Sequence, residues 1–216
     1  MTVGVDSLPA VVPVFAVPGA LLLPGARLPL SVFEPRYLAL TDHALGAGRL
    51  FALVQPRDGD GGTVPGLYDV GTLARIVAFG ETDDGRYLIT AQGVARFRLV
   101  REDQMDPAGF RRVAADYRPF AAVDFGGDSS RIDRRRLLNA VLTYLARQGV
   151  GSDLGKLDGG SDSDLVSALA MAAPLSAEEK QALLEADTAA ERARMMIALF
   201  EMALLADDDG GGMSLH

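Results

Sequence analysis

The chain has 216 residues, enough for one large domain or two small ones. Its composition, 49% apolar and 23% charged, is typical of a folded globular protein and not of a disordered one. The absence of cysteine excludes disulfides and thiolate metal sites, and the presence of only two histidines argues against a zinc centre. We therefore expect no metal and no cofactor. The net charge of −8 disfavours nucleic acid and anionic membranes as partners, because both select clustered Lys and Arg.

An uncharged stretch of 20 residues, Ser7–Ala26, has the length of a transmembrane helix. Four prolines and two glycines interrupt it, and proline removes a backbone donor that a helix in lipid needs. No Lys or Arg precedes Arg27, which argues against a secretory signal. We expect a cytoplasmic protein that does not contact a membrane.

The first half of the chain has the pattern of a β-rich domain with one helix. Glu34-Pro35 is typical of a helix start, and Gly46 of its end. Asp84-Gly85 predicts a tight hairpin turn, and the Gly- and Pro-rich stretch 56–71 predicts a long loop. The predicted strands are Val11–Val17, Leu28–Phe33, Leu50–Gln55, Leu73–Phe79, Tyr87–Ala91, Val94–Val100 and a last one around Phe110–Tyr117.

The second half is predicted to be helical after a linker at 124–130. Ser176 with Glu179 and Thr188 with Glu191 have the spacing of capping boxes. The last helix is apolar on nearly every face, so we expect protein to surround it. We therefore predict a β-rich domain over 8–120, a helical domain over 130–206 and a disordered acidic tail over 207–216. The predicted helices are a first one from Ser130 to just before Gly149, then Asp162–Ala173, Ser176–Ala186 and Thr188–Ala206.

An ordered series of short motifs resembles the substrate-binding N-terminal domain of the Lon protease family over roughly residues 8–205. The resemblance implies an α+β protein, with a PUA-like β pseudo-barrel in the first half and an all-α helical bundle in the second. It also implies a role in recognising unfolded or tagged polypeptides. The motifs are Phe33-Glu34-Pro35-Arg36-Tyr37, Tyr68-Asp69-Val70-Gly71-Thr72, Asp84-Gly85-Arg86-Tyr87, Gly93-Val94-Ala95-Arg96-Phe97 and the helical stretch Leu165–Glu185.

The sequence lacks the motifs of the ATPase and peptidase modules of a Lon protease. Lys156 follows Gly155 but precedes Leu157, so no phosphate-binding loop of the GxxxxGK[ST] type is present. The chain therefore looks like a free-standing version of the domain: a polypeptide-binding module that is not an enzyme and has no catalytic residues. Its expected partners are unfolded or tagged polypeptides, and a partner protease is left open.

Two segments are candidates for polypeptide binding. Three leucines beside the Pro24-Gly25 turn should not all face inward, so we expect at least one to be exposed, with docking and core packing equally favoured. Phe33–Tyr37 either packs the barrel under the helix, with Glu34 paired to Arg36, or lines a peptide groove; packing is the favoured alternative. The candidate binding residues are Leu21, Leu22, Leu23, Pro24, Phe33, Arg36 and Tyr37.

Other conspicuous residues have ordinary explanations. His43 is expected to be a solvated helix residue and not a catalytic base. Arg131, Arg134 and Arg135 share a helix face that could bind phosphate, but we favour pairing with nearby aspartates (Asp124, Asp128 and Asp133). Met195, Met196 and Met202 are expected to fill the core. Two alternatives remain: an RNA-binding protein, which a PUA-like fold permits by analogy, and a hydrolase that uses carboxylates alone.

Overall fold

The computed structural model of the protein describes residues 4–57, 65–148 and 161–210. The chain divides into two compact units, each of which is described by itself. The barrel unit comprises Met1–Gly127 and Ala173–Glu185, and the helical unit comprises Asp128–Ala172 and Ala186–His216. The segment 173–185 therefore belongs to the barrel unit, although the sequence pattern placed it in a helical domain over 130–206.

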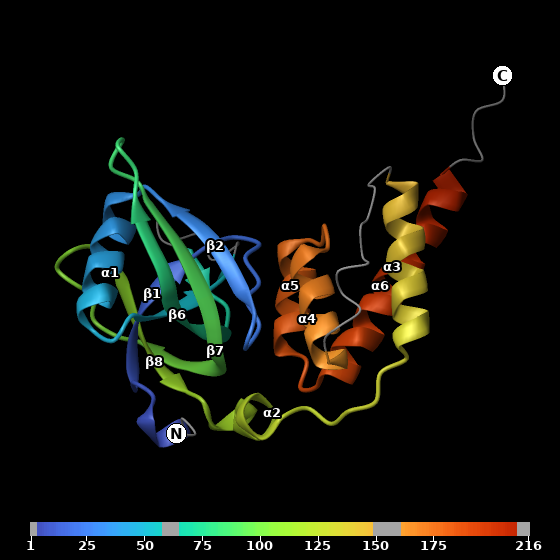
Figure 1. The fold of residues 1–216 in the computed structure, drawn as a ribbon, viewed down its shortest axis with the longest axis horizontal. Helices are drawn as coiled ribbons and strands as arrows, with labels where there is room; N and C mark the ends of the chain where they lie inside the picture. Colours follow the sequence, from blue (N-terminus) through green and yellow to red (C-terminus); the bar gives the residue numbers. More distant parts are fainter. Residues whose placement is uncertain (1–3, 58–64, 149–160, 211–216) are drawn as a thin grey trace. The chain divides into compact units, whose positions relative to one another are not determined.

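The barrel unit is built on a mixed six-stranded sheet in the order β2-β7-β6-β3-β1-β8 (Figure 1). A further pairing between β7 and β8 closes five of these strands into a barrel and leaves β2 attached outside the ring. The β1–β3 pair is parallel, and the other pairs are antiparallel. The six strands of this sheet are β1 (Val11–Ala16), β2 (Arg27–Val32), β3 (Leu50–Val54), β6 (Val70–Glu81), β7 (Tyr87–Glu102) and β8 (Arg111–Asp116).

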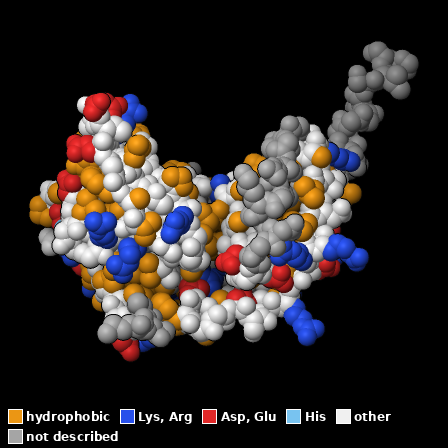
Figure 2. Space-filling model, in the orientation of Figure 1, with side chains coloured by type: hydrophobic (Ala, Val, Ile, Leu, Met, Phe, Trp, Pro, Cys, Tyr) orange, Lys and Arg blue, Asp and Glu red, His pale blue; other side chains and the backbone are white. Residues whose placement is uncertain are grey.

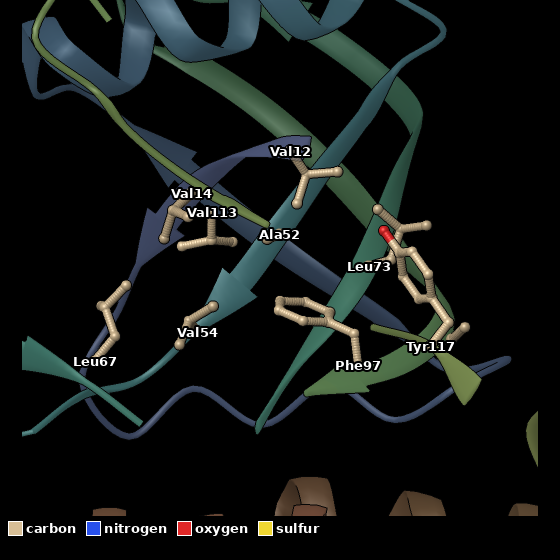
Figure 3. Close-up of a cluster of buried hydrophobic side chains, with 10 residues drawn as sticks. Val12, Val14, Ala52, Val54, Leu67, Leu73, Phe97, Val113 and Tyr117 are labelled. Atoms are coloured by element: carbon tan, nitrogen blue, oxygen red, sulfur yellow. The ribbon is translucent and has the colours of Figure 1, made fainter. Parts of the chain in front are cut away.

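The core of the barrel is formed by apolar side chains that alternate along these strands and point inward (Figure 3). Phe97 and Tyr117 meet edge to face there, with ring centroids 5.9 Å apart. Burial raises the pKa of Tyr117, so its hydroxyl stays protonated and donates to the Pro9 carbonyl oxygen. The buried cluster consists of Val12, Val14, Ala52, Val54, Leu67, Leu73, Ala95, Phe97, Val113 and Tyr117.

Turn chemistry shapes the barrel as the sequence predicts. Gly85 has a φ of 79°, and its N–H donates to the Thr82 carbonyl, which forms the predicted turn between β6 and β7. In the stretch predicted as a loop, two short strands pair with each other, β4 (Pro56–Arg57) and β5 (Gly66–Leu67). Residues 58–64 of that stretch lie outside the described residues.

Among its described residues, the barrel unit also contains three helices and two short 3₁₀ turns. Pro35 begins α1 (Pro35–Gly46), as expected from its fixed φ at a first helical turn. The linker predicted at 124–130 is partly helical. The helix α2 (Ala121–Gly126) follows directly after the 3₁₀ turn Arg118–Phe120 and includes the first residues of that linker. The Ser176 capping box begins α5 (Ala177–Glu185): Ser176 N–H donates to Glu179 Oε2 at 2.7 Å, and Glu179 N–H donates back to Ser176 Oγ at 3.2 Å. A turn at Val5–Ser7 precedes β1.

The described part of the helical unit contains α3 (Arg134–Arg147), α4 (Asp162–Ala172) and α6 (Ala189–Gly210). Asp133, rather than Ser130, begins the first of these helices, because its carboxylate accepts the Arg136 N–H. The Thr188 capping box forms in altered geometry: Glu191 N–H donates to Thr188 Oγ1, whereas the Glu191 carboxylate accepts from Asp187.

Two expectations for the last helix are wrong. Met202 and Leu205 are 66% and 67% exposed, so protein does not surround α6 on every face; only its stripe through Met196 and Phe200 is buried. Residues 207–210 of the predicted disordered tail continue α6, although Asp and Gly are weak helix formers and aspartates at a helix C-terminus oppose its dipole. The rest of the predicted tail, 211–216, lies outside the described residues.

Candidate functional site

The leucine segment that we expected to dock polypeptide is core. Leu21, Leu22 and Leu23 are 3%, 1% and 1% exposed, so the prediction that at least one is accessible is wrong. The reason is a close crossing over β7: a Cβ on Gly93 would lie 2.3 Å from the Leu23 carbonyl oxygen, so the segment rests directly on the strand. Pro24 beside it is half-buried.

Hydrogen bonds hold this segment against both β6 and α5. The Thr72 hydroxyl donates to the Leu22 carbonyl at 2.6 Å, and Lys180 Nζ on α5 donates to the Gly19 carbonyl at 3.1 Å. Covered by these elements, an extended segment can bury successive side chains that would otherwise alternate between core and solvent. The helix that covers the segment lies more than 150 residues further along the chain. The local sequence around the leucines therefore does not indicate that they are buried.

A buried pair of glutamines attaches α5 to the barrel. Gln55 accepts the Gly19 N–H at 2.9 Å and donates to Gln181 Oε1 at 3.1 Å. Gln181 in turn donates to the Val70 carbonyl at 3.1 Å. Because a buried amide without partners is costly, these satisfied amides fix the position of α5 on the barrel. No local signal in the sequence distinguishes them from exposed glutamines.

Arg96 on β7 forms a second buried polar cluster, with Asp124 on α2. Both side chains are nearly inaccessible, at 1% and 3% exposed, and Arg96 Nη2 lies 2.9 Å from Asp124 Oδ1. Arg96 Nη1 donates to the Leu184 carbonyl at 3.2 Å, and the guanidinium stacks 4.5 Å from the centroid of the Phe120 ring. The cluster ties α2 and the end of α5 to β7. The cluster stabilises the fold, and because both charges are buried, neither is available to a ligand.

The junction between β2 and α1 combines a buried and an exposed aromatic ring. Tyr37 is buried and stacks on Phe15 with centroids 4.1 Å apart, and Glu34 pairs with Arg36 at 2.8 Å, so these parts of the packing prediction are confirmed. Burial raises the pKa of Tyr37, and its neutral hydroxyl donates to the Ala16 carbonyl at 2.8 Å. Phe33, however, is 64% exposed, and the prediction that it packs the barrel is wrong. Val32 on β2 is buried, so Phe33, the next residue of an extended chain, points to the opposite side and is left outside.

Two adjoining pockets lie at this junction, both lined by Ala16, Pro18, Glu34 and Tyr37. The smaller, of about 210 Å³, extends along β2 to Phe33. The larger, of about 320 Å³, extends toward the loop before β8, where Arg36, Met105, Phe110 and Arg111 line it. We call the two together the junction groove.

The junction groove is apolar at its floor and charged at its rim. Phe33 and Met105 expose more than half of their side chains at its two ends, where an apolar group of a ligand could cover them. Of the charged residues at the rim, Glu34 pairs with Arg36, and Arg111 pairs with Glu102 and also donates to the Pro65 carbonyl at 2.9 Å. On the face seen in Figure 2, the barrel unit exposes hydrophobic side chains between its Lys and Arg side chains.

The remaining candidates do not line this groove. His43 is exposed on α1, as predicted, and its ring lies 5.4 Å from that of Phe110, which lines the larger pocket. The predicted pairing of the arginine cluster with Asp124, Asp128 and Asp133 is wrong. Arg134 pairs with Asp162 and the adjacent Arg136 with Glu201, whereas Asp124 pairs with Arg96. Met196 fills the core as predicted, whereas Met202 does not.

Within the described residues, no group of three or more histidine, cysteine, aspartate or glutamate side chains has a geometry that could hold a metal ion. In the same part of the chain, no helix is both long and apolar enough to span a bilayer.

Comparison with known proteins identifies the family. The family model of the ATP-dependent protease La (LON) substrate-binding domain matches residues 11–201. The Lon protease of Desulfosudis oleivorans is 28% identical over 191 residues, which are 83% of this chain and 22% of that protein. Lon protease 2 of Thermus thermophilus is 29% identical over 205 residues, 91% of this chain and 25% of that protein. The chain spans about a quarter of the length of these curated relatives.

Solved structures agree with this family match. A Lon N-terminal domain protein from Xanthomonas campestris superposes with a TM-score of 0.62 at 26% identity, covering 87% of this chain and 97% of that one. The N-terminal domain of a Mycobacterium avium complex Lon protease has the same TM-score at 20% identity and shares the fold. The α+β class, with a PUA-like barrel followed by helices, is thereby confirmed. Because the family model covers most of the sequence, the chain belongs to the Lon substrate-binding domain family.

Proposed function

We propose that this protein binds unfolded or tagged polypeptides and that the junction groove of the barrel unit is where it binds them. The observation that carries the proposal is the pair of adjoining pockets with exposed Phe33 and Met105 at their two ends. An apolar floor accepts side chains that a folded protein hides and an unfolded one exposes. Membership in a substrate-binding family supports a polypeptide as the ligand.

The proposed activity is binding alone. The family match concerns the substrate-binding domain, and the described residues that line the groove form no arrangement of nucleophile and base that could cleave a peptide bond. We therefore propose that the protein presents its clients to a protease and does not cut them. In this proposal the purified chain neither hydrolyses ATP nor cleaves casein, and ATP turnover above a buffer blank would contradict it.

Binding can be measured by fluorescence anisotropy with a labelled model polypeptide, reduced and carboxymethylated α-lactalbumin, which stays unfolded in buffer. Burying one large apolar side chain contributes about 1.5 to 3 kcal/mol, or roughly tenfold to a hundredfold in affinity. We expect Phe33→Ser combined with Met105→Ser to weaken binding by at least that tenfold. The melting temperature should barely change, since both residues are already exposed.

Val100→Ser is the matched control. Val100 lies on the same unit and is 61% exposed, but it lines neither pocket. This variant should bind like the unaltered protein. Full affinity in the Phe33 and Met105 double variant would show that the groove is not the binding site, and no binding by the unaltered chain would refute the function itself.

A further inference from the structure

One strand of the sheet has an edge that the fold leaves unpaired. The barrel closes through the β7–β8 pairing, so β2 pairs with β7 on one side and with no other strand of the described chain. An unpaired edge presents a row of backbone N–H and C=O groups that another extended chain can pair with. Proteins usually cover such edges or interrupt them.

The residues of β2 that face this free edge follow from one hydrogen bond. The Gly93 N–H donates to the Ala26 carbonyl at 3.0 Å, so Ala26, which directly precedes β2, directs its backbone toward β7. The register from Arg27 to Val32 has no bulge, and backbone direction alternates along a strand. Arg27, Pro29 and Ser31 therefore direct their backbone groups outward. All three residues are exposed.

Proline is tolerated at this edge because its missing N–H falls on the outward side. Pro29 leaves two outward donors, the N–H groups of Arg27 and Ser31, and three outward carbonyls on β2. A proline in the middle of the row also hinders the pairing of two identical edges, which would otherwise lead to aggregation. The edge is thus interrupted at its centre and open at the Ser31 end.

The open end of the edge borders the smaller pocket of the junction groove. Residues Leu30–Phe33 form one wall of that pocket, and Phe15–Pro18 form the other. A strand paired with Ser31 would therefore run alongside an apolar pocket of about 210 Å³, large enough for an aliphatic side chain. Backbone pairing and a side-chain pocket meet at one place.

We propose that a client polypeptide binds as an added β-strand on the free edge of β2, with Ser31 exchanging both backbone hydrogen bonds and one apolar client side chain in the adjoining pocket. This inference rests on the proposed function and specifies its substrate class: extended, unfolded segments with an apolar residue. Backbone pairing suits such clients, because every unfolded chain offers the same N–H and C=O groups whatever its sequence. The pocket then selects segments with an apolar side chain at one position.

Ser31→Pro tests the backbone contact. Proline removes the outward N–H of Ser31, and Pro29, two residues earlier with the same outward direction, shows that β2 accepts proline at such a position. Ser31→Thr is the matched control, because threonine keeps the N–H and favours strands. With unfolded α-lactalbumin as the probe, we expect Ser31→Pro to bind about tenfold more weakly than Ser31→Thr.

A second probe tests the same contact on the unaltered chain, in case Ser31→Pro folds poorly. A ten-residue peptide of alternating Leu and Ser is compared with two versions of itself, N-methylated at every Leu or at every Ser, which block one backbone edge each. Pairing by one edge predicts that the methylation on the paired edge abolishes binding and the other leaves it intact. Protection of the Ser31 amide from hydrogen exchange when the unmethylated peptide binds would support the proposal directly.

The outcomes separate this inference from the proposed function. If Phe33→Ser weakens binding while both Ser31 variants bind alike and both methylated peptides bind fully, the groove binds side chains only and strand addition is wrong. If the unaltered chain binds neither probe, both proposals are wrong. If Ser31→Pro instead converts a dimer to a monomer, the edge pairs with a second copy of this chain, which also overturns the proposal.

Discussion

Arg96 and Asp124 are the clearest case in which a residue acts differently in the folded protein than its type and local pattern indicate. On β7, Arg96 alternates with the core residues Ala95 and Phe97, which is the pattern of a solvent-facing position. In the structure it is buried, because α2 and α5 cover that face of the strand. The pair is therefore a structural element whose loss should be costly.

We expect Asp124→Ala to lower the free energy of unfolding of the barrel unit by about 3 to 5 kcal/mol, because it leaves the Arg96 cation buried without its partner. Urea denaturation followed by tyrosine fluorescence measures this unit selectively, since four of the five tyrosines lie in it. Arg118→Ala, which removes only the exposed pair with Asp116, should leave the midpoint unchanged. Equal effects of the two substitutions would contradict this account.

Asp128 links the stability of the helical unit to pH. Burial raises the pKa of its carboxyl, but hydrogen bonds from Ser130 and from the Ala189 N–H at the start of α6 outweigh that effect and hold the pKa below its ordinary value of 3.8. A lowered pKa in the folded state stabilises the fold above the unfolded-state value. That contribution disappears as the pH falls through the folded-state value.

We therefore expect Asp128→Asn to be less stable than the unaltered chain at pH 7, with the difference vanishing at a pH well below 3.8. Urea denaturation followed by circular dichroism at 222 nm, at pH 7 and at pH 2, would measure the difference. A gap that stays constant between the two pH values would show that Asp128 does not act through its charge.

Among the elements, the segment that crosses β7 shows most directly how a single backbone contact decides burial. Gly93 N–H and C=O bond to Ala26 and Gly25, and no side chain fits between the two backbones. The three leucines before Pro24 are core because this crossing is so close. Glycine at position 93 is therefore required for packing.

Gly93→Ala should destabilise the barrel unit by about 1 to 3 kcal/mol or more, because the new Cβ would meet the Leu23 carbonyl oxygen at 2.3 Å, and backbone cannot give way as a flexible side chain does. Gly80→Ala on β6 is the control, since its Cβ would meet nothing within 4 Å. Thermal unfolding should separate the two variants clearly. Equal melting temperatures would mean that the crossing relaxes without cost.

At the scale of the whole molecule, the division into units does not follow the order of the chain. The helix α5 lies in sequence between α4 and α6 of the helical unit but belongs to the barrel unit. Gln181, Lys180 and the Leu184 carbonyl supply partners for barrel groups that are otherwise buried without them. The barrel is therefore incomplete without a segment that follows it by nearly fifty residues.

A protein of residues 1–127 should melt at a lower temperature than the same residues joined through a Gly/Ser linker to 173–185. The linked form restores the partners of Gln55, Val70 and Arg96, and it covers the leucine segment. Differential scanning calorimetry of the two proteins would measure the contribution of α5. Identical melting temperatures would show that the barrel is stable without it.

Much of the secondary structure and the family could be predicted from the sequence. The hairpin at Asp84-Gly85, the proline start of α1 and the Ser176 capping box are local, because each depends on residues within a few positions of one another. The burial of the leucine segment could not be predicted in this way. The exposure of Phe33, in contrast, agrees with the alternation of Leu30 and Val32 along β2, which is a local pattern.

The sequence by itself determined the α+β class, the helix and turn signals and the membership of the Lon substrate-binding family, because these depend on short-range patterns and on the order of motifs along the chain. Only the tertiary structure decided which apolar residues are accessible, where the junction groove lies and that β2 keeps a free edge. The physical reason is that accessibility and strand pairing depend on which distant segments cover a residue. Gly93 against Leu23 and Gln55 against Gln181 are contacts of that kind.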